Sequence, residues 1–187
     1  SQGAGVRVIS GNKTGYAYTD VVDEERLVRA AEIAAYVASG GNAGTTVSLT
    51  DADYSSFVTV EMPLGEIADE QRIEMMKRAD QAALSYDPRI KMAMVDYYDE
   101  VRGRVIANSE GLYLRDELPL LFFIVQAMSA DGSGRHMARE RLSMHSGFEM
   151  FSHVTPEEVA RNAAREAIAM LGAQEAPAGI MDVVMQN

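Results

Sequence analysis

The three histidines are the residues of this sequence best suited to hold a metal ion. His136, His145 and His153 are nine and eight residues apart, a spacing that matches no compact zinc pattern. If residues 135–145 form one unbroken strand, His136 and His145 point to opposite faces and cannot share an ion. The sequence also contains neither H-E-x-x-H nor H-E-x-x-x-H. We therefore assign no metal ligand in this chain and expect surface or half-buried histidines.

Nucleophilic and acid–base catalysis have no better support. The sequence has no cysteine, and no serine lies in a G-x-S-x-G elbow. Ser109 and Glu110 are neighbours in "NSEG", but an Asn/Ser/Gly cluster between two strands predicts a turn. Adjacent carboxylates such as Asp99 and Glu100 lie near predicted turns, and nothing in their spacing predicts a shared proton. We assign no catalytic residue.

A local group of cations stands out against an acidic background. Arg135, Arg139 and Arg141 share one face if their strand is regular, with Met137 between them. This face could receive the carboxylate of a peptide or an acidic partner surface. A solvated edge strand, protected by charge against aggregation, explains the same pattern and is the interpretation that we favour.

The elements at the start of the chain are a hairpin and a helix. The β-prone runs "GVRVIS" and "TGYAYTD" flank "SGNK", which favours a tight turn. "GAGVRV" lacks the third glycine and the following helix of a dinucleotide loop, so its glycines are predicted to be structural. Small apolar residues then recur at helical spacing from Leu27 to Ala38, after Glu24 and Glu25 and before Gly40-Gly41.

Two further helices are predicted. One runs from about Asp69 to Tyr86 and ends before Pro88. We expect its inward residues to be Ile73, Met76, Ala83 and Leu84. The last helix has the strongest signals, because Thr155 is a natural N-cap, Pro156 takes the first helical position and Glu158 completes a capping box. Its apolar stripe comprises Ala160, Ala163, Ala164, Ala167, Ile168 and Leu171.

The remaining segments are strand-like. "TTVSL" and "SFVTVEM" indicate short strands, and residues 89–151 contain five strand-like runs with turns at "NSEG" and "ADGSG". Short connections favour an antiparallel meander. We therefore predict an α+β fold, with a large, mostly antiparallel sheet and about three helices packed on it. We treat residues 1–187 as one domain, in which a linker over residues 173–179 leads into a buried strand, "IMDVVMQN".

Composition limits the class of function. The formal net charge of -11 argues against nucleic-acid binding, since such surfaces need Lys and Arg to displace phosphate counterions. The most apolar run, residues 118–128, is too short to cross a membrane. The absence of cysteine and of a basic-then-apolar start fits a reducing cytoplasm, where we expect the protein to act.

Four stretches, in order, resemble the TldD/PmbA family. They are "GAGVRVISGNKTGYAYTD", "VIANSEGLYLRDE", "HSGFEMF" and "ARNAAREAIAMLGAQEAPAGIMDVVM". They are similar to that family's glycine-rich hairpin, "NSEG" turn, G-F/Y-E segment, and helix with an "APAG" linker and strand. The family-motif residues, which we expect to be structural here, are Gly3, Gly5, Arg7, Gly15, Asn108, Ser109, Glu110 and Gly111.

The resemblance implies a function that these residues do not themselves display. In the family, known by an older name as modulators of DNA gyrase, the strand after "APAG" leads to a helix with H-E-x-x-x-H, whose histidines bind zinc. The chain would then be an interior portion of the N-terminal half of a zinc-dependent peptidase for unfolded or extended peptides. This portion would form a chamber wall and a surface for a partner subunit, in a homodimer or a heterodimer with a paralogue. The alternative is a non-catalytic partner subunit or assembly module of the same family.

Overall fold

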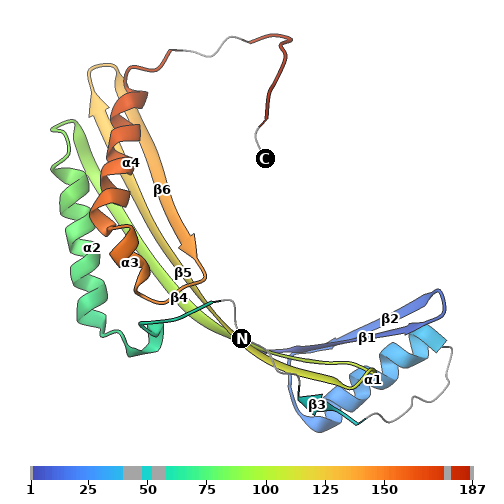
Figure 1. Cartoon of the computed structure of the whole chain (residues 1–187). Coiled ribbons are helices and arrows are strands. Elements are labelled where there is room, and N and C mark those ends of the chain that lie inside the picture. The colour runs from blue at the N-terminus through green and yellow to red at the C-terminus, as the bar shows by residue number, and fades with distance from the viewer. Residues whose placement is uncertain (1, 40–47, 52–57, 175–177, 186–187) are drawn as a thin grey trace. The chain divides into compact units, whose positions relative to one another are not determined.

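The computed structural model describes residues 2–39, 48–51, 58–174 and 178–185. Contacts within the chain fall into two compact units, where we had expected one domain. The first comprises Ser1–Thr50 and Asn108–Leu112, and the second comprises Asp51–Ala107 and Tyr113–Asn187. Both appear in Figure 1, and each is described by itself.

The first unit is the predicted hairpin with its helix. Strands β1 (Ala4–Ser10) and β2 (Lys13–Thr19) pair in antiparallel register, and Gly11 has a φ of 58° at the turn between them. Helix α1 (Glu24–Ser39) packs against both strands. Its alanine face at Ala30, Ala34 and Ala38 is buried, as the helical spacing predicts. The predicted stop at Gly40-Gly41 lies outside the described residues.

The first unit also contains the start of a short strand that pairs with the segment Asn108–Leu112. Strand β3 (Thr50–Asp51) follows two described residues without regular structure, and the Thr50 N–H donates to the Gly111 carbonyl oxygen at 2.8 Å. The predicted strands "TTVSL" and "SFVTVEM" lie largely outside the described residues. Their described parts, residues 48–49 and 58–62, are not strands.

The second unit is built on three long antiparallel strands, which form the predicted meander. They are β4 (Ile90–Ala107), β5 (Leu112–Asp131) and β6 (Gly134–Met144), and β5 pairs with both neighbours. The sequence predicted four separate strand-like runs in this region, but they form only two continuous strands, β4 and β5. Pro119 does not break β5, because β6 pairs only as far as Leu121 and needs no N–H from residue 119. The turns at "NSEG" and "ADGSG" are where we predicted them.

Helices cover one face of this sheet (Figure 1). Helix α2 (Asp69–Leu84) packs on β4, and α4 (Pro156–Met170) packs on β6 and against α2. Two single-turn elements, η1 (Leu64–Glu66) and α3 (Met150–His153), precede them. The core between sheet and helices contains Leu121, Phe123, Val125, Met150, Ala160 and Ala164. An antiparallel sheet with helices on one face confirms the α+β class.

Helix α2 buries a different stripe from the one that we expected. Ile73 and Leu84 are 51% and 41% exposed, so two of the four predicted inward residues are wrong. Ala83 is buried as predicted, and Met75 and Ala79 are the other buried residues of the helix. These residues are spaced by four, and their alanines let α2 approach β4 and α4 closely, which larger side chains would prevent.

Helix α4 begins as its sequence predicts. The Thr155 hydroxyl accepts from the Glu158 N–H at 3.3 Å, and the Glu158 carboxylate accepts from the Thr155 N–H at 2.8 Å. The predicted alanine stripe is buried. None of the helices that the structure describes is long and apolar enough to cross a membrane.

The described part of the predicted terminal strand, residues 180–185, is not in a strand. Residues 178–185 have no regular secondary structure, and Ile180, Val184 and Met185 are fully or almost fully exposed. A strand needs a neighbour to satisfy its backbone groups, and no described strand pairs with these residues.

Candidate functional site

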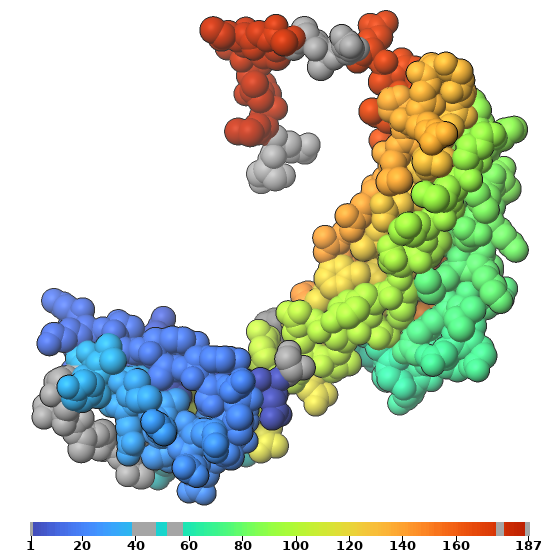
Figure 2. Space-filling view, turned by 180° about the vertical axis from the view of Figure 1, so that it is seen from behind, coloured from blue at the N-terminus to red at the C-terminus, as the bar shows by residue number. Residues whose placement is uncertain are grey.

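The face of the β4–β6 sheet opposite the helices is the main candidate surface. Figure 2 looks onto it and shows strands β4, β5 and β6 with no helix in front of them. Strand alternation decides which side chains lie there. Those on β4 and β5 include Met92, Met94, Asp96, Tyr98, Phe122 and Ile124. The apolar members of this face lack the cover that the helices give to the other face.

The three predicted arginines lie together on this open face. Every second residue of β6 from Arg135 to Arg141 faces this side and is exposed: Arg135, Met137, Arg139 and Arg141. Within the described part of the chain, none of the three forms an ion pair with a carboxylate. The Arg141 guanidinium lies 4.7 Å from the centre of the Phe122 ring, which is a cation–π contact. Strand β6 pairs only with β5 among the described strands, so it is an edge strand, as we expected.

The glycine-rich motif residues lie in the first unit and have structural roles. At Gly15, a Cβ atom would overlap the Ala34 carbonyl oxygen and lie 3.0 Å from the Ala38 nitrogen. Only glycine therefore lets α1 pack this close to β2. At Gly3 and Gly5, the tyrosine rings of the neighbouring strand fold over the space that a Cβ would fill. Arg7 is exposed on the hairpin face away from α1.

The "NSEG" motif is a turn whose side chains serve the backbone. The Asn108 side-chain oxygen accepts from the N–H groups of Glu110 and Leu112 at 3.0 and 3.1 Å. Gly111 has a φ of 91°, a conformation that favours glycine. Ser109 and Glu110 are exposed at the tip. The motif therefore closes the β4–β5 hairpin.

The segment "HSGFEMF" contains a buried carboxylate that sequence analysis did not single out. Glu149 is 9% exposed. Its Oε1 accepts from the Ser146 hydroxyl and the Gly147 N–H, both at 2.8 Å, and its Oε2 accepts from the Met62 N–H at 2.9 Å. Burial acts to raise the pKa of Glu149, but these hydrogen bonds outweigh it and hold the pKa below its usual value.

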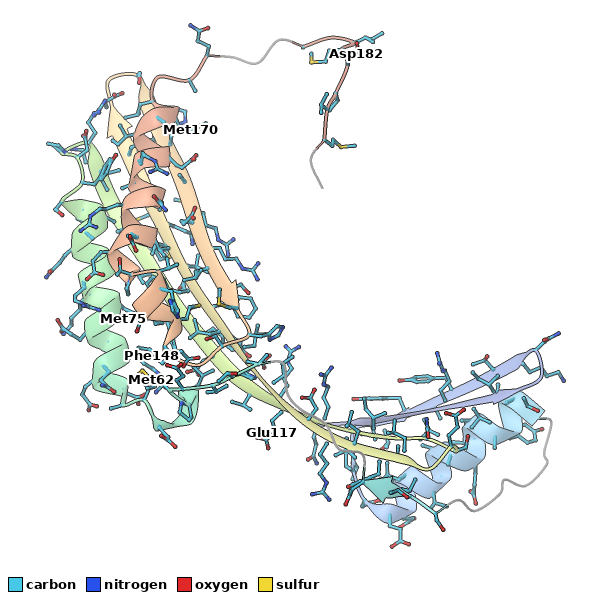
Figure 3. The ribbon with its side chains drawn as sticks, in the orientation of Figure 1. Met62, Met75, Glu117, Phe148, Met170 and Asp182 are labelled. Carbon is cyan, nitrogen blue, oxygen red and sulfur yellow. The ribbon has the colours of Figure 1, made fainter. Side chains whose placement is uncertain are left out.

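This carboxylate ties a loop to the start of α3. Phe148 donates its N–H to the Met62 carbonyl oxygen at 2.9 Å, and the two residues lie side by side in Figure 3. Gly147 leaves no room for a Cβ, which would overlap the Met62 carbonyl. Since Glu149 already accepts three hydrogen bonds and is held ionised, it is a poor base for Ser146. The pair stabilises the fold and does not form a nucleophilic site.

A second polar cluster lies between α2 and β4. Arg72 donates to the carbonyl oxygens of Leu64 and Ile67 at 2.6 and 2.8 Å and to Asp99 at 3.1 Å. Tyr97 donates to the same Asp99 oxygen at 2.7 Å. Burial, followed by the hydrogen bond to Asp99, raises the pKa of Tyr97. The cluster holds η1 against the sheet through paired charges.

The histidines do not assemble a metal centre. His136 belongs to β6, His145 lies just after it with Nδ1 2.9 Å from the Pro119 carbonyl oxygen, and His153 ends α3. His153 borders a surface hollow of about 510 Å³ together with Tyr86 and four polar residues of α4. Across the described residues, no group of three or more His, Asp or Glu could hold a metal ion. These residues therefore do not fit a zinc site.

Two family models match the chain. The model described as the PmbA/TldA metallopeptidase central domain matches residues 63–171, which is more than half of the 187 residues. The model described as the PmbA/TldA metallopeptidase domain 1 matches residues 1–38. The chain belongs to the TldD/PmbA metallopeptidase family. The resemblance inferred from the four motifs is therefore confirmed.

Curated relatives and solved structures agree with this assignment. The chain is similar to a metalloprotease TldD homolog of Haemophilus influenzae, at 27% identity over 194 residues, and to a metalloprotease of Methanothermobacter thermautotrophicus, at 24% over 186 residues. Each match covers 98% of the chain and 40% of the relative. The chain thus spans about two fifths of the length of these relatives.

The solved structures show the same fold. One is a Thermotoga maritima protein described as a modulator of a DNA gyrase, with a TM-score of 0.68 at 22% identity over 95% of this chain and 39% of that one. Another is TldE from Thermococcus kodakarensis, with a TM-score of 0.55 at 18% identity over 88% of this chain and 36% of that one.

Proposed function

We propose that this TldD/PmbA chain is part of a zinc-dependent peptidase that acts on unfolded or extended peptides. The match of residues 63–171 to a metallopeptidase central domain carries the proposal. Since the described residues fit no zinc site, the zinc ligands and the groups that activate water would come from residues outside this chain. The zinc ion would supply a Lewis acid and a nucleophilic water.

In this proposal the chain contributes shape and contacts. The uncovered face of the β4–β6 sheet would form part of a chamber wall, and other surfaces of the two units would meet a partner subunit. That partner would be a second copy or a paralogue, and the complex would act in the cytoplasm. The support is an exposed sheet face with apolar side chains and with arginines that form no ion pair among the described residues, which is unusual for a surface without a ligand.

The test compares the 187-residue chain with a longer protein that contains it. We expect the longer protein to cleave an unfolded polypeptide such as reduced, alkylated lactalbumin, to spare a folded protein, and to lose activity with a zinc chelator. The chain alone should neither bind zinc tightly nor cleave. Tight zinc binding or hydrolysis by the chain alone would overturn the proposal.

The alternative function is that of a non-catalytic partner subunit. The lack of a metal-binding group among the described residues is compatible with either function. The discriminating feature is an H-E-x-x-x-H sequence after the strand that follows "APAG" in the longer protein. If it is absent, we expect activity only when a second subunit is added. Direct DNA binding is disfavoured by the net charge of -11, and a salt-sensitive affinity for duplex DNA would revive it.

A further inference from the structure

The open face of the β4–β6 sheet combines flexible apolar side chains with arginines that have no ion-pair partner among the residues that the structure describes. On the neighbouring strand β5, Gln126 is the register partner of Arg139 and Ile124 is the register partner of Arg141. Both arginines therefore border the apolar centre of the face. Residues aligned across the three strands form rows perpendicular to the strands. The row next to that of Arg139 contains a methionine on each strand, Met92, Met128 and Met137. Cations and methionines therefore occupy adjacent rows of one surface.

The face is polarised across its width. Arg135, Arg139 and Arg141 lie on β6, whereas the carboxylates Asp96 and Glu100 lie on β4, where Arg102 forms an ion pair with Glu100. The charged residues of β4 and those of β6 are two strand spacings apart, or about 10 Å. The β6 arginines therefore have no carboxylate beside them within the described residues, although the chain has 28 Asp and Glu against 17 Lys and Arg. An anionic ligand placed over β6 would supply the missing charge.

The methionines indicate what else the ligand carries. Met94 and Met137 are 47% and 54% exposed. Methionine is unbranched and polarisable, so a methionine surface adapts to apolar side chains of different shapes. The Arg141 contact with Phe122 keeps one guanidinium beside this apolar surface. The ligand that fits has apolar groups at its centre and carboxylates along one side.

We propose that this face binds an extended acidic polypeptide segment, with its Asp or Glu side chains over Arg139 and Arg141 and its apolar side chains on the methionine row. This inference rests on the proposed function, since it names the class of peptide that the peptidase receives. An extended segment is favoured because its side chains alternate with the same period as those of the sheet. A second copy of the chain is the competing occupant.

Binding is measured by fluorescence anisotropy with the 187-residue chain and three labelled twelve-residue peptides of Ser and Leu. The peptides differ only in having Glu, Gln or Lys at the same four positions. We expect the Glu peptide to bind tightest and the Lys peptide weakest. Affinity for the Glu peptide should fall as salt rises from low to physiological concentration, since exposed charges are screened.

Matched variants locate the site. Arg139→Gln with Arg141→Gln should weaken binding of the Glu peptide about tenfold, because it removes two exposed ion pairs with the peptide. The control is Arg161→Gln with Arg165→Gln, which removes the same charge from the exposed side of α4 and should leave the affinity within about twofold. Met137→Gln should weaken all three peptides, and Met170→Gln on α4 should not.

Three outcomes would overturn the proposal. The first is equal binding of the three peptides, and the second is an equal effect of the two double-arginine variants. The third is that the chain binds no peptide but self-associates in sedimentation, and that Arg139→Gln with Arg141→Gln abolishes the self-association. The last outcome would assign the face to a second copy. Since the assay involves no cleavage, its failure leaves the proposed peptidase function standing. If the longer protein showed no peptidase activity but the chain still bound the Glu peptide, the proposed peptidase function would fail and the binding proposal would stand.

Discussion

Replacing Glu149 by Gln tests whether the buried carboxylate ties the Met62 loop to α3. Both carboxylate oxygens accept hydrogen bonds, from Ser146 and Gly147 on one side and from Met62 on the other. An amide can present only one oxygen, so its NH₂ group must face at least one of these donors. At least one hydrogen bond is lost and one buried N–H is left unsatisfied.

The expected loss of stability follows from these contacts. Hydrogen bonds to a charged group contribute about 1.5–3 kcal/mol each, and an unsatisfied buried donor costs about 1–3 kcal/mol. We therefore expect Glu149→Gln to lower the free energy of unfolding by about 2–4 kcal/mol at pH 7. Urea denaturation followed by circular dichroism measures it. Glu166→Gln, an exposed carboxylate on α4, is the control and should stay within about 0.5 kcal/mol.

The difference between wild type and Glu149→Gln should also depend on pH. The pKa of Glu149 is lowered on folding from its ordinary value of 4.5. A group with a lowered folded pKa contributes its full stability above the unfolded pKa and loses it as pH falls through the folded pKa. The difference should therefore be constant from pH 7 to about 5 and shrink below about 4.5. A difference below 0.5 kcal/mol at pH 7, or one unchanged between pH 7 and pH 3, would refute this account.

Two further substitutions test local packing and capping. Gly15→Ala places a Cβ against the backbone of α1 at Ala34 and should cost about 3 kcal/mol, read as faster amide hydrogen exchange in α1. Gly103→Ala has open space at its Cβ and should be neutral, so equal effects of the two would count against close helix–strand approach. Thr155→Ala should lower stability by about 1 kcal/mol in a thermal melt, and Thr155→Ser, which keeps the hydroxyl that caps Glu158, should restore most of it.

Local signals predicted the elements that depend on short-range chemistry. The capping box at Thr155 and Glu158 and the turn at Asn108–Gly111 involve residues two to four positions apart. Alternation along β6 also predicted that Arg139 and Arg141 share a face. Such features follow from backbone geometry, which the sequence sets within a few residues.

Contacts between distant segments could not be predicted in this way. Glu149 accepts from Met62, 87 positions away, and nothing near Glu149 distinguishes it from an exposed carboxylate. The inward stripe of α2 was wrong at Ile73 and Leu84 for the same reason. Which face of an amphipathic helix is buried depends on the strand and helix that it meets, and small residues are chosen where these approach closely.

The sequence by itself determined the α+β class, the start of the last helix, the hairpins and the family, because each rests on local propensity or on ordered motifs. Only the tertiary structure decided which face of the β4–β6 sheet is covered, and that Arg139 and Arg141 form no ion pair with a described carboxylate and lie beside a row of methionines. The physical reason is that alternation fixes which residues share a face. Which of the two faces the helices cover depends on packing between segments far apart in the chain.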